Sequence, residues 1–149
     1  EGFFVTEIEW LDAQSIYSFR GAKIENIHII GHSRGGGIAL LAGNKYGEIK
    51  KIVTWAAVAD FMERLPNAQE LKKWKENGVF YIKNGRTHQN MPMKYNFVQT
   101  LLNQREVLNI EQSVRKIEKP LLIVHGTNDE TVSVENAERI KSWKSDAKI

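Results

Sequence analysis

The fold is decided by Ile27-His28-Ile29-Ile30-Gly31-His32-Ser33-Arg34-Gly35-Gly36-Gly37. A short run of apolar residues ends at Gly31, and a Gly-x-Ser-x-Gly spacing follows around Ser33. Residues 38–42 then have the apolar composition of a helix that packs on a core. The order of patterns predicts a buried strand, a tight turn that carries one serine, and a helix.

This order is the layout of a nucleophile elbow, in which a strained turn lifts a serine hydroxyl clear of the sheet. Gly31 and Gly35 lack Cβ atoms, and we expect them to let the strand and the helix approach closely. Ser33 is predicted at a helix N-terminus, where the backbone N–H of Arg34 would supply half of an oxyanion hole. The alternative is a phosphate or dinucleotide site with a bystander serine. The spacings typical of those sites are absent.

The composition limits the classes of protein to which this chain can belong. The chain has 149 residues, 42% of them hydrophobic and 26% charged, which predicts one globular domain. The net charge is only +3, and the basic cluster at 72–75 is flanked by acidic residues, so we expect no nucleic-acid partner. No membrane partner is expected, because no apolar run reaches membrane-spanning length and no signal peptide is recognisable. The absence of cysteine fits a cytoplasmic protein.

Strand and helix patterns alternate along the chain. Buried strands are predicted at 27–30, 52–58 and 121–124, with the start of a fourth at 147–149. Helices are predicted at 4–19 with Gly21 as C-cap, at 33–46, 69–77, 95–108 and 111–117, and after Ser133 as N-cap. Such alternation predicts an α/β fold with a mainly parallel sheet in three layers.

The interval from 59 to 120 is too long for a simple crossover between two strands. Within it, Asn84-Gly85 stands between two strand-like runs, 79–83 and 86–90, which predicts a β-hairpin. Its aromatic residues could line an acyl pocket, although packing within the interval itself is the simpler interpretation. These residues are Trp74, Phe80, Tyr81 and Phe97.

A serine nucleophile needs a base, usually histidine, and an acid that orients the base. Asp129 is the expected acid, since it follows the third predicted strand at the edge of the sheet where ligands bind. A local turn with Asn128 is the alternative role for Asp129. Asp60 is a second candidate acid, but capping the helix that opens the long interval suits it better.

None of the four histidines fits the role of the base. His28 is expected in the core, His32 to point away from the serine's side of the sheet, His88 on the surface, and His125 in a structural hydrogen bond. Because the usual order along the chain is serine, acid, histidine, we expect the base beyond Ile149. The chain begins at Glu1 and has its first methionine at Met62, so we expect a piece of a longer protein.

Three motifs together resemble the α/β-hydrolase superfamily: Gly31-His32-Ser33-Arg34-Gly35-Gly36, Leu121-Leu122-Ile123-Val124-His125-Gly126 and Asn128-Asp129. The chain looks most similar to the bacterial dienelactone-hydrolase-like and serine-aminopeptidase-like branch, over the later half of that fold. The resemblance implies that Ser33 is the nucleophile, Asp129 the triad acid, and Arg34 an oxyanion donor. It also implies a partial hydrolase domain at 1–149, with a cap at 59–119. Dienelactone hydrolases use a cysteine where this chain has Ser33, so their lactone chemistry is not implied.

The expected function is a serine hydrolase that acts on carboxylic esters of small molecules and needs no metal or organic cofactor. Peptide or amide substrates are the close alternative. A different class of alternative is a non-catalytic fragment that forms homo-oligomers through an exposed strand edge at 27–30. Without its histidine, the 149-residue chain is expected to lose on the order of a millionfold in turnover.

Overall fold

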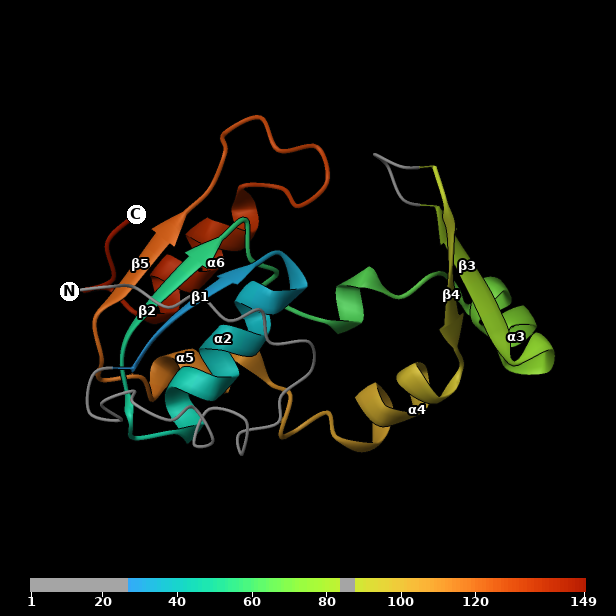
Figure 1. The fold of residues 1–149 in the computed structure, drawn as a ribbon, viewed down its shortest axis with the longest axis horizontal. Coiled ribbons are helices and arrows are strands. Elements are labelled where there is room, and N and C mark those ends of the chain that lie inside the picture. The colour runs from blue at the N-terminus through green and yellow to red at the C-terminus, as the bar shows by residue number, and fades with distance from the viewer. Residues whose placement is uncertain (1–26, 84–87) are drawn as a thin grey trace.

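The computed structural model describes residues 27–83 and 88–149, which form two parts (Figure 1). We call residues 27–59 and 110–149 the base, and the described residues of 60–109 the insertion. The predicted helix at 4–19, its C-cap Gly21, and the hairpin turn Asn84-Gly85 lie outside the described residues.

The base is built on a parallel sheet whose strands lie in the order β1-β2-β5: Ile27–His32, Ile49–Trp55 and Leu121–Val124. The strands predicted at 27–30 and 121–124 are confirmed. The strand predicted at 52–58 is wrong at both ends, because β2 begins at Ile49 and turns away after Trp55. Lys148 forms a parallel bridge with Leu122, as expected for a strand that starts at 147–149.

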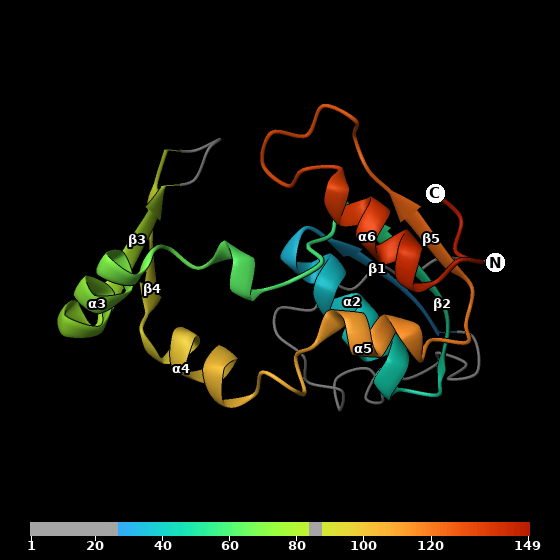
Figure 2. The same cartoon turned by 180° about the vertical axis from the view of Figure 1, so that it is seen from behind.

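Three helices cover one face of this sheet: α2, α5 and α6, spanning Arg34–Lys45, Ile110–Arg115 and Glu135–Trp143 (Figures 1 and 2). Between helices and sheet lies an apolar core that includes Leu40, Ile52, Val114, Ile123 and Ile140. All three predicted helices of the base are therefore found. Ser133 does not cap α6, however, because Val134 takes the cap position and makes no side-chain cap bond.

The opposite face of the sheet is open among the described residues. Ile30 is 72% exposed and Trp55 is 57% exposed on this face, so two of the three expected layers are present in the part described. The prediction that His28 lies in the core is wrong, because its side chain belongs to the same open face and is exposed. Side chains alternate along a strand, so one buried face does not bury them all.

The insertion extends from the base as a smaller unit (Figure 2). It contains a short 3₁₀ helix η2, then α3, β3, β4 and α4: Met62–Arg64, Ala68–Asn77, Val79–Lys83, Asn90–Lys94 and Asn96–Asn103. The hairpin is confirmed, although its second strand begins at Asn90 rather than at residue 86. The helix predicted at 95–108 ends early, at Asn103. Trp74 is buried, and its Nε1–H donates to the carbonyl of Met93 at 2.9 Å.

The two junctions between insertion and base lie side by side. A Cβ atom on Gly37 would come within 2.9 Å of both Phe61 Cζ, where the chain leaves the base, and Ile110 Cδ1, where it returns. Glycine at this position of α2 therefore lets both junctions pack on one helix turn. None of the helices in the described part of the chain combines the length and apolar character needed to cross a bilayer.

Candidate active site

Ser33 occupies the turn between β1 and α2, with the strained backbone angles φ 55° and ψ −119°. A positive φ at a residue other than glycine costs free energy and persists only where neighbouring structure enforces it. Here the N–H of Ser33 donates to the carbonyl of Trp55 at 2.8 Å. Its own carbonyl accepts from Gly36 at 3.0 Å and Val58 at 3.2 Å. Three backbone hydrogen bonds thus hold the serine in this conformation.

Gly31 meets the expectation of close approach and Gly35 does not. A Cβ on Gly31 would lie 2.2 Å from the carbonyl oxygen of Gly35 and 2.7 Å from Ala39 Cβ, which no side chain tolerates. A Cβ on Gly35 would meet nothing within 4 Å, so the sequence-based role of Gly35 is wrong. The backbone of Gly35, not its missing side chain, is what approaches the strand.

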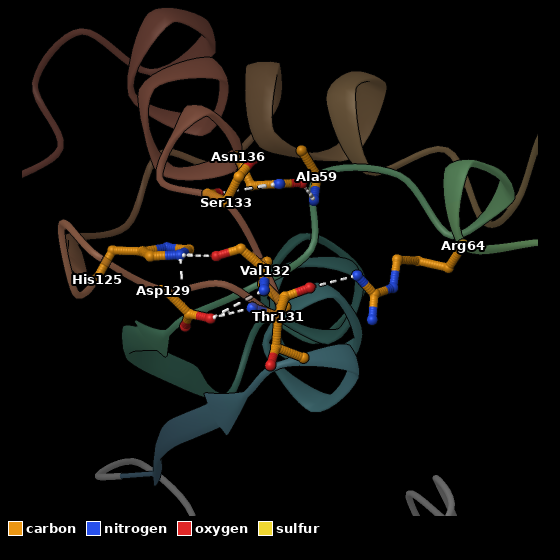
Figure 3. A network of polar contacts seen from close by, with 8 residues as sticks. All are labelled: Ala59, Arg64, His125, Asp129, Thr131, Val132, Ser133 and Asn136. Atoms are coloured by element: carbon orange, nitrogen blue, oxygen red, sulfur yellow. Dashed lines mark hydrogen bonds and ion pairs between the residues drawn. The ribbon is translucent and has the colours of Figure 1, made fainter. Parts of the chain in front are cut away.

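Asp129 lies in the loop between β5 and α6 (Figure 3). Its Oδ1 accepts hydrogen bonds from the N–H groups of Thr131 and Val132, both at 2.9 Å. The local turn considered as an alternative role is therefore present, though with these partners rather than Asn128. Oδ2 makes neither bond and lies 3.9 Å from His125 Nε2.

The pKa of the Asp129 carboxyl is lowered, chiefly by the hydrogen bonds from Val132 and Thr131. Burial opposes these hydrogen bonds by raising the pKa, and the charges of His125 and His32 each lower it by a smaller amount. The carboxylate therefore stays ionised at neutral pH.

His125 has the structural hydrogen bond that the sequence predicts. Its Nε2 lies 2.7 Å from the carbonyl oxygen of Val132, and because a carbonyl can only accept, Nε2 carries the hydrogen. Its Nδ1 is buried and has no hydrogen-bond partner among the described residues. The ring is thus held by a hydrogen bond to the loop that contains Asp129 and is not available as the base for Ser33.

The remaining candidates fall outside the site. His88 is exposed, as predicted. His32 packs edge-on against Trp55, with ring centroids 5.3 Å apart. Asp60 Oδ1 accepts from the N–H of Met62 at 2.7 Å at the start of the insertion, but Phe61 takes the N-cap position of η2, so the predicted capping by Asp60 is found only as this local bond. Among the described residues, no histidine hydrogen-bonds to Ser33 or Asp129.

Ser33 and Asp129 follow the carboxyl ends of β1 and β5, which are parallel strands of one sheet with β2 between them. One hydrogen bond joins the Asp129 loop to the insertion: Arg64 Nη1 donates to the carbonyl of Thr131 at 2.6 Å (Figure 3). Within the base, the N–H of Ala59 donates to Asn136 Oδ1 of α6 at 2.9 Å.

A cavity of about 160 Å³ lies between the first turn of α2 and the insertion. Its lining consists of two arginines and eight apolar residues: Arg34, Arg64, Phe61, Leu65, Pro66, Trp74, Phe80, Ile82, Met93 and Phe97. Tyr81 is 59% exposed and takes no part in the lining. Sequence reasoning missed Arg64, because only the folded insertion brings it beside α2.

A parallel sheet with helices, carrying a serine on a strained strand-to-helix turn and an aspartate after a later strand, has the α/β-hydrolase architecture. The chain is a member of the α/β-hydrolase superfamily, as the sequence motifs imply. Within it, the chain belongs to the BD-FAE family, whose model matches residues 6–143.

Among curated proteins, the chain is similar to an uncharacterized peptidase, YtmA, of Bacillus subtilis, with 28% identity over 116 residues. The match covers 77% of this chain and 39% of the relative. Est1E from Butyrivibrio proteoclasticus has a TM-score of 0.62 and 23% identity, over 91% of this chain and 55% of that one. A monoacylglycerol lipase from Paleococcus ferrophilus has a TM-score of 0.65 and 17% identity, over 92% of this chain and 61% of that one. The chain therefore spans about two fifths to three fifths of the length of these proteins.

Proposed function

We propose that the whole protein is a serine hydrolase that cleaves carboxylic esters, with Ser33 as nucleophile and Asp129 as the acid of its triad. The observation that carries this proposal is the strained φ of Ser33, enforced by three backbone hydrogen bonds at the N-terminus of α2. Backbone strain of this kind, on a serine that opens a helix, is what a nucleophile elbow requires.

In the proposed reaction, Ser33 Oγ attacks the acyl carbonyl carbon while a histidine accepts the hydroxyl proton. The N–H of Arg34 donates to the oxyanion that forms. Collapse of this intermediate releases the alcohol, which takes the proton from the imidazolium. Water then attacks the acyl-enzyme with the same histidine as base, which frees the acid and restores Ser33.

We place the histidine outside these 149 residues, because none of the four in the chain is arranged to reach Ser33. Asp129 Oδ2 is suited to orient it, since Oδ1 already accepts two backbone N–H groups. We propose that the insertion forms a cap over the site. Ester substrates are favoured by the lipase name of the Paleococcus structure, and peptide substrates by the name of the Bacillus relative.

The test uses the whole protein with a fluorophosphonate probe and short p-nitrophenyl esters. We expect stoichiometric labelling and ester hydrolysis in the wild type, and loss of both in Ser33→Ala. Ser142→Ala, on the exposed side of α6, is the matched control and should keep both. Labelling that survives in Ser33→Ala would show that another residue is the nucleophile. The 149-residue chain by itself should label slowly, and rapid labelling there would mean that one of its own groups serves as base.

A second candidate function is self-association of the chain through its sheet. The open face with Ile30 and Trp55 favours it, as does β1, which pairs only with β2 among the described residues. We expect the 149-residue chain to form dimers or larger species in sedimentation at high concentration. Trp55→Lys should weaken them, whereas Tyr81→Lys, at a similarly exposed aromatic of the insertion, should not. A monomer at all concentrations would contradict this function.

A further inference from the structure

We propose that the cavity between α2 and the insertion recognises a carboxylate, and that the substrate carries one on a small apolar group bound beside Ser33. The group that holds it is the guanidinium of Arg34, assisted by Arg64. This assignment rests on the proposed function for its link to catalysis, but the binding site itself can be tested separately.

The first argument is that two arginines share the cavity without an acidic partner. Neither Arg34 nor Arg64 forms an ion pair with an acidic residue in the described part of the chain. One nitrogen of Arg64 donates to the carbonyl of Thr131, and its other N–H donors remain available to a ligand. Two like charges that face one cavity repel each other, and an anion between them removes that cost.

The burial of Arg34 also favours an anionic ligand. Burial lowers the pKa of its guanidinium, and the charge of Arg64 lowers it further, with no carboxylate acting in the opposite direction. The guanidinium lies over the ring of Phe97, with 4.9 Å from the guanidinium carbon to the ring centroid. This stacking orients the planar group but does not neutralise it. A guanidinium held in this way presents its remaining N–H fork to a carboxylate.

The volume and the lining of the cavity limit the size and polarity of the group that carries the carboxylate. Its volume of about 160 Å³ is close to that of a cavity that holds one benzene ring. Apolar side chains from the residues that flank η2, from α3, from the hairpin and from α4 form the walls, so the body of the ligand group is apolar. A ring or short chain that ends in a carboxylate meets both conditions.

The position of the cavity connects it to the reaction. Arg34 directly follows Ser33, and consecutive Cα atoms are about 3.8 Å apart. The N-terminus of α2, a helix of 12 residues, adds further positive potential on the same side. The side chain of Arg34 can therefore be changed without removing its backbone N–H from the oxyanion hole, which keeps the two roles separable.

The binding test uses the whole protein with Ser33→Ala, so that no turnover occurs, and compares benzoate with its neutral counterpart benzamide. The indole N–H of Trp74 serves as a local NMR reporter, because Trp74 lines the cavity. We expect benzoate to bind about 10- to 100-fold more tightly than benzamide, as a charge-assisted hydrogen bond allows. Arg34→Gln should abolish the preference, Arg34→Lys should keep part of it, and Arg64→Gln should reduce it. Lys73→Gln, at an exposed cation of α3, should leave it unchanged.

The kinetic test separates this inference from the proposed function. In the wild-type whole protein, benzoate should inhibit hydrolysis of p-nitrophenyl acetate competitively, and benzamide should inhibit much less. Benzoate binding that depends on Arg34, without any hydrolysis, would overturn the proposed function and support the site. Hydrolysis with equal binding of benzoate and benzamide would overturn the site alone. A preference that persists in Arg34→Gln combined with Arg64→Gln would also overturn it.

Discussion

The base and the insertion differ in how densely their side chains are packed. In the base, helices α2, α5 and α6 bury a continuous apolar core, and glycines of α2 meet the sheet without room for a Cβ. In the insertion, Trp74 is the only buried residue of α3, and the β3–β4 hairpin has no fully buried side chain. In α4, Val98 and Leu101 are buried, and Leu101 belongs to the core of the base. The helices and strands of the insertion therefore bury few side chains of their own.

The difference teaches where rigidity is needed. The proposed nucleophile and acid both belong to the base, where strain can be held by dense packing. The cavity lies where the insertion meets the base, and the thin packing of the insertion suits a surface that must admit a ligand. The predictions below test this division of roles.

The largest expected effect is on catalysis, at Asp129. Asp129→Asn keeps an oxygen that can accept from Thr131 and Val132, so the loop should stay folded while the charge that orients the base is lost. We expect kcat of the whole protein to fall about ten-thousandfold, measured with p-nitrophenyl esters. Asp60→Asn is the matched control, since Asp60 makes a similar bond at the start of the insertion. Equal losses in both variants would mean that Asp129 acts only in its turn.

The lowered pKa of Asp129 also predicts the direction of a pH effect on stability. A carboxyl whose folded-state pKa is depressed contributes stability above its unfolded pKa of about 3.9, and loses it as the pH falls through the folded value. The difference in unfolding free energy between wild type and Asp129→Asn should therefore shrink as the pH falls below the unfolded pKa of about 3.9. Chemical denaturation at several pH values measures this, and a gap that widens in acid would contradict it.

Trp74→Ala should be the most damaging single change in the insertion. Removal of a buried Trp side chain costs about 3–5 kcal/mol, which exceeds what the sparse surroundings of α3 can absorb. We expect the insertion to open while the base keeps its cooperative transition, as hydrogen exchange would show region by region. Trp74→Phe keeps a ring and loses the bond to Met93, and should cost less. Simultaneous loss of protection in base and insertion would show that the two parts unfold as one.

Two glycines of one motif offer a sharper test of packing in the base. Gly31→Ala should destabilise by about 1–3 kcal/mol or more, because its Cβ overlaps the carbonyl of Gly35. Gly35→Ala, inside α2, should change stability by less than about 1 kcal/mol, or raise it. Urea unfolding of both variants measures the contrast. Similar effects at the two positions would contradict the close approach of strand and helix.

The smallest effect is expected at the ion pair between Arg139 of α6 and Glu63 of η2, whose closest atoms are 2.8 Å apart. Both side chains are about half exposed, so Glu63→Gln should cost at most about 1 kcal/mol. Raising the salt concentration to about 0.5 M should remove the difference from wild type. A larger loss would mean that this contact holds the insertion against the base.

The sequence was most informative where local chemistry and tertiary structure agree. The order of strand, turn and helix around Ser33 and the strand at 121–124 follow from short-range rules and are confirmed. β2 was placed three residues late, because Lys50 and Lys51 are two consecutive exposed residues at a register shift, which interrupts the apolar pattern of the strand. The second hairpin strand contains Pro92, which masks its pattern and is tolerated in a two-stranded ribbon. Arg64 could not be found, since its role depends on a contact between distant parts of the chain.

The meeting of Phe61 and Ile110 on Gly37 has an evolutionary consequence. Because the chain departs and returns at one point of α2, a different segment spliced between these residues would leave the strands of the sheet and helices α2, α5 and α6 in place. Lineages that share this scaffold can thus exchange the intervening module, or shorten it to a loop, and acquire new selectivity without redesigning the chemistry.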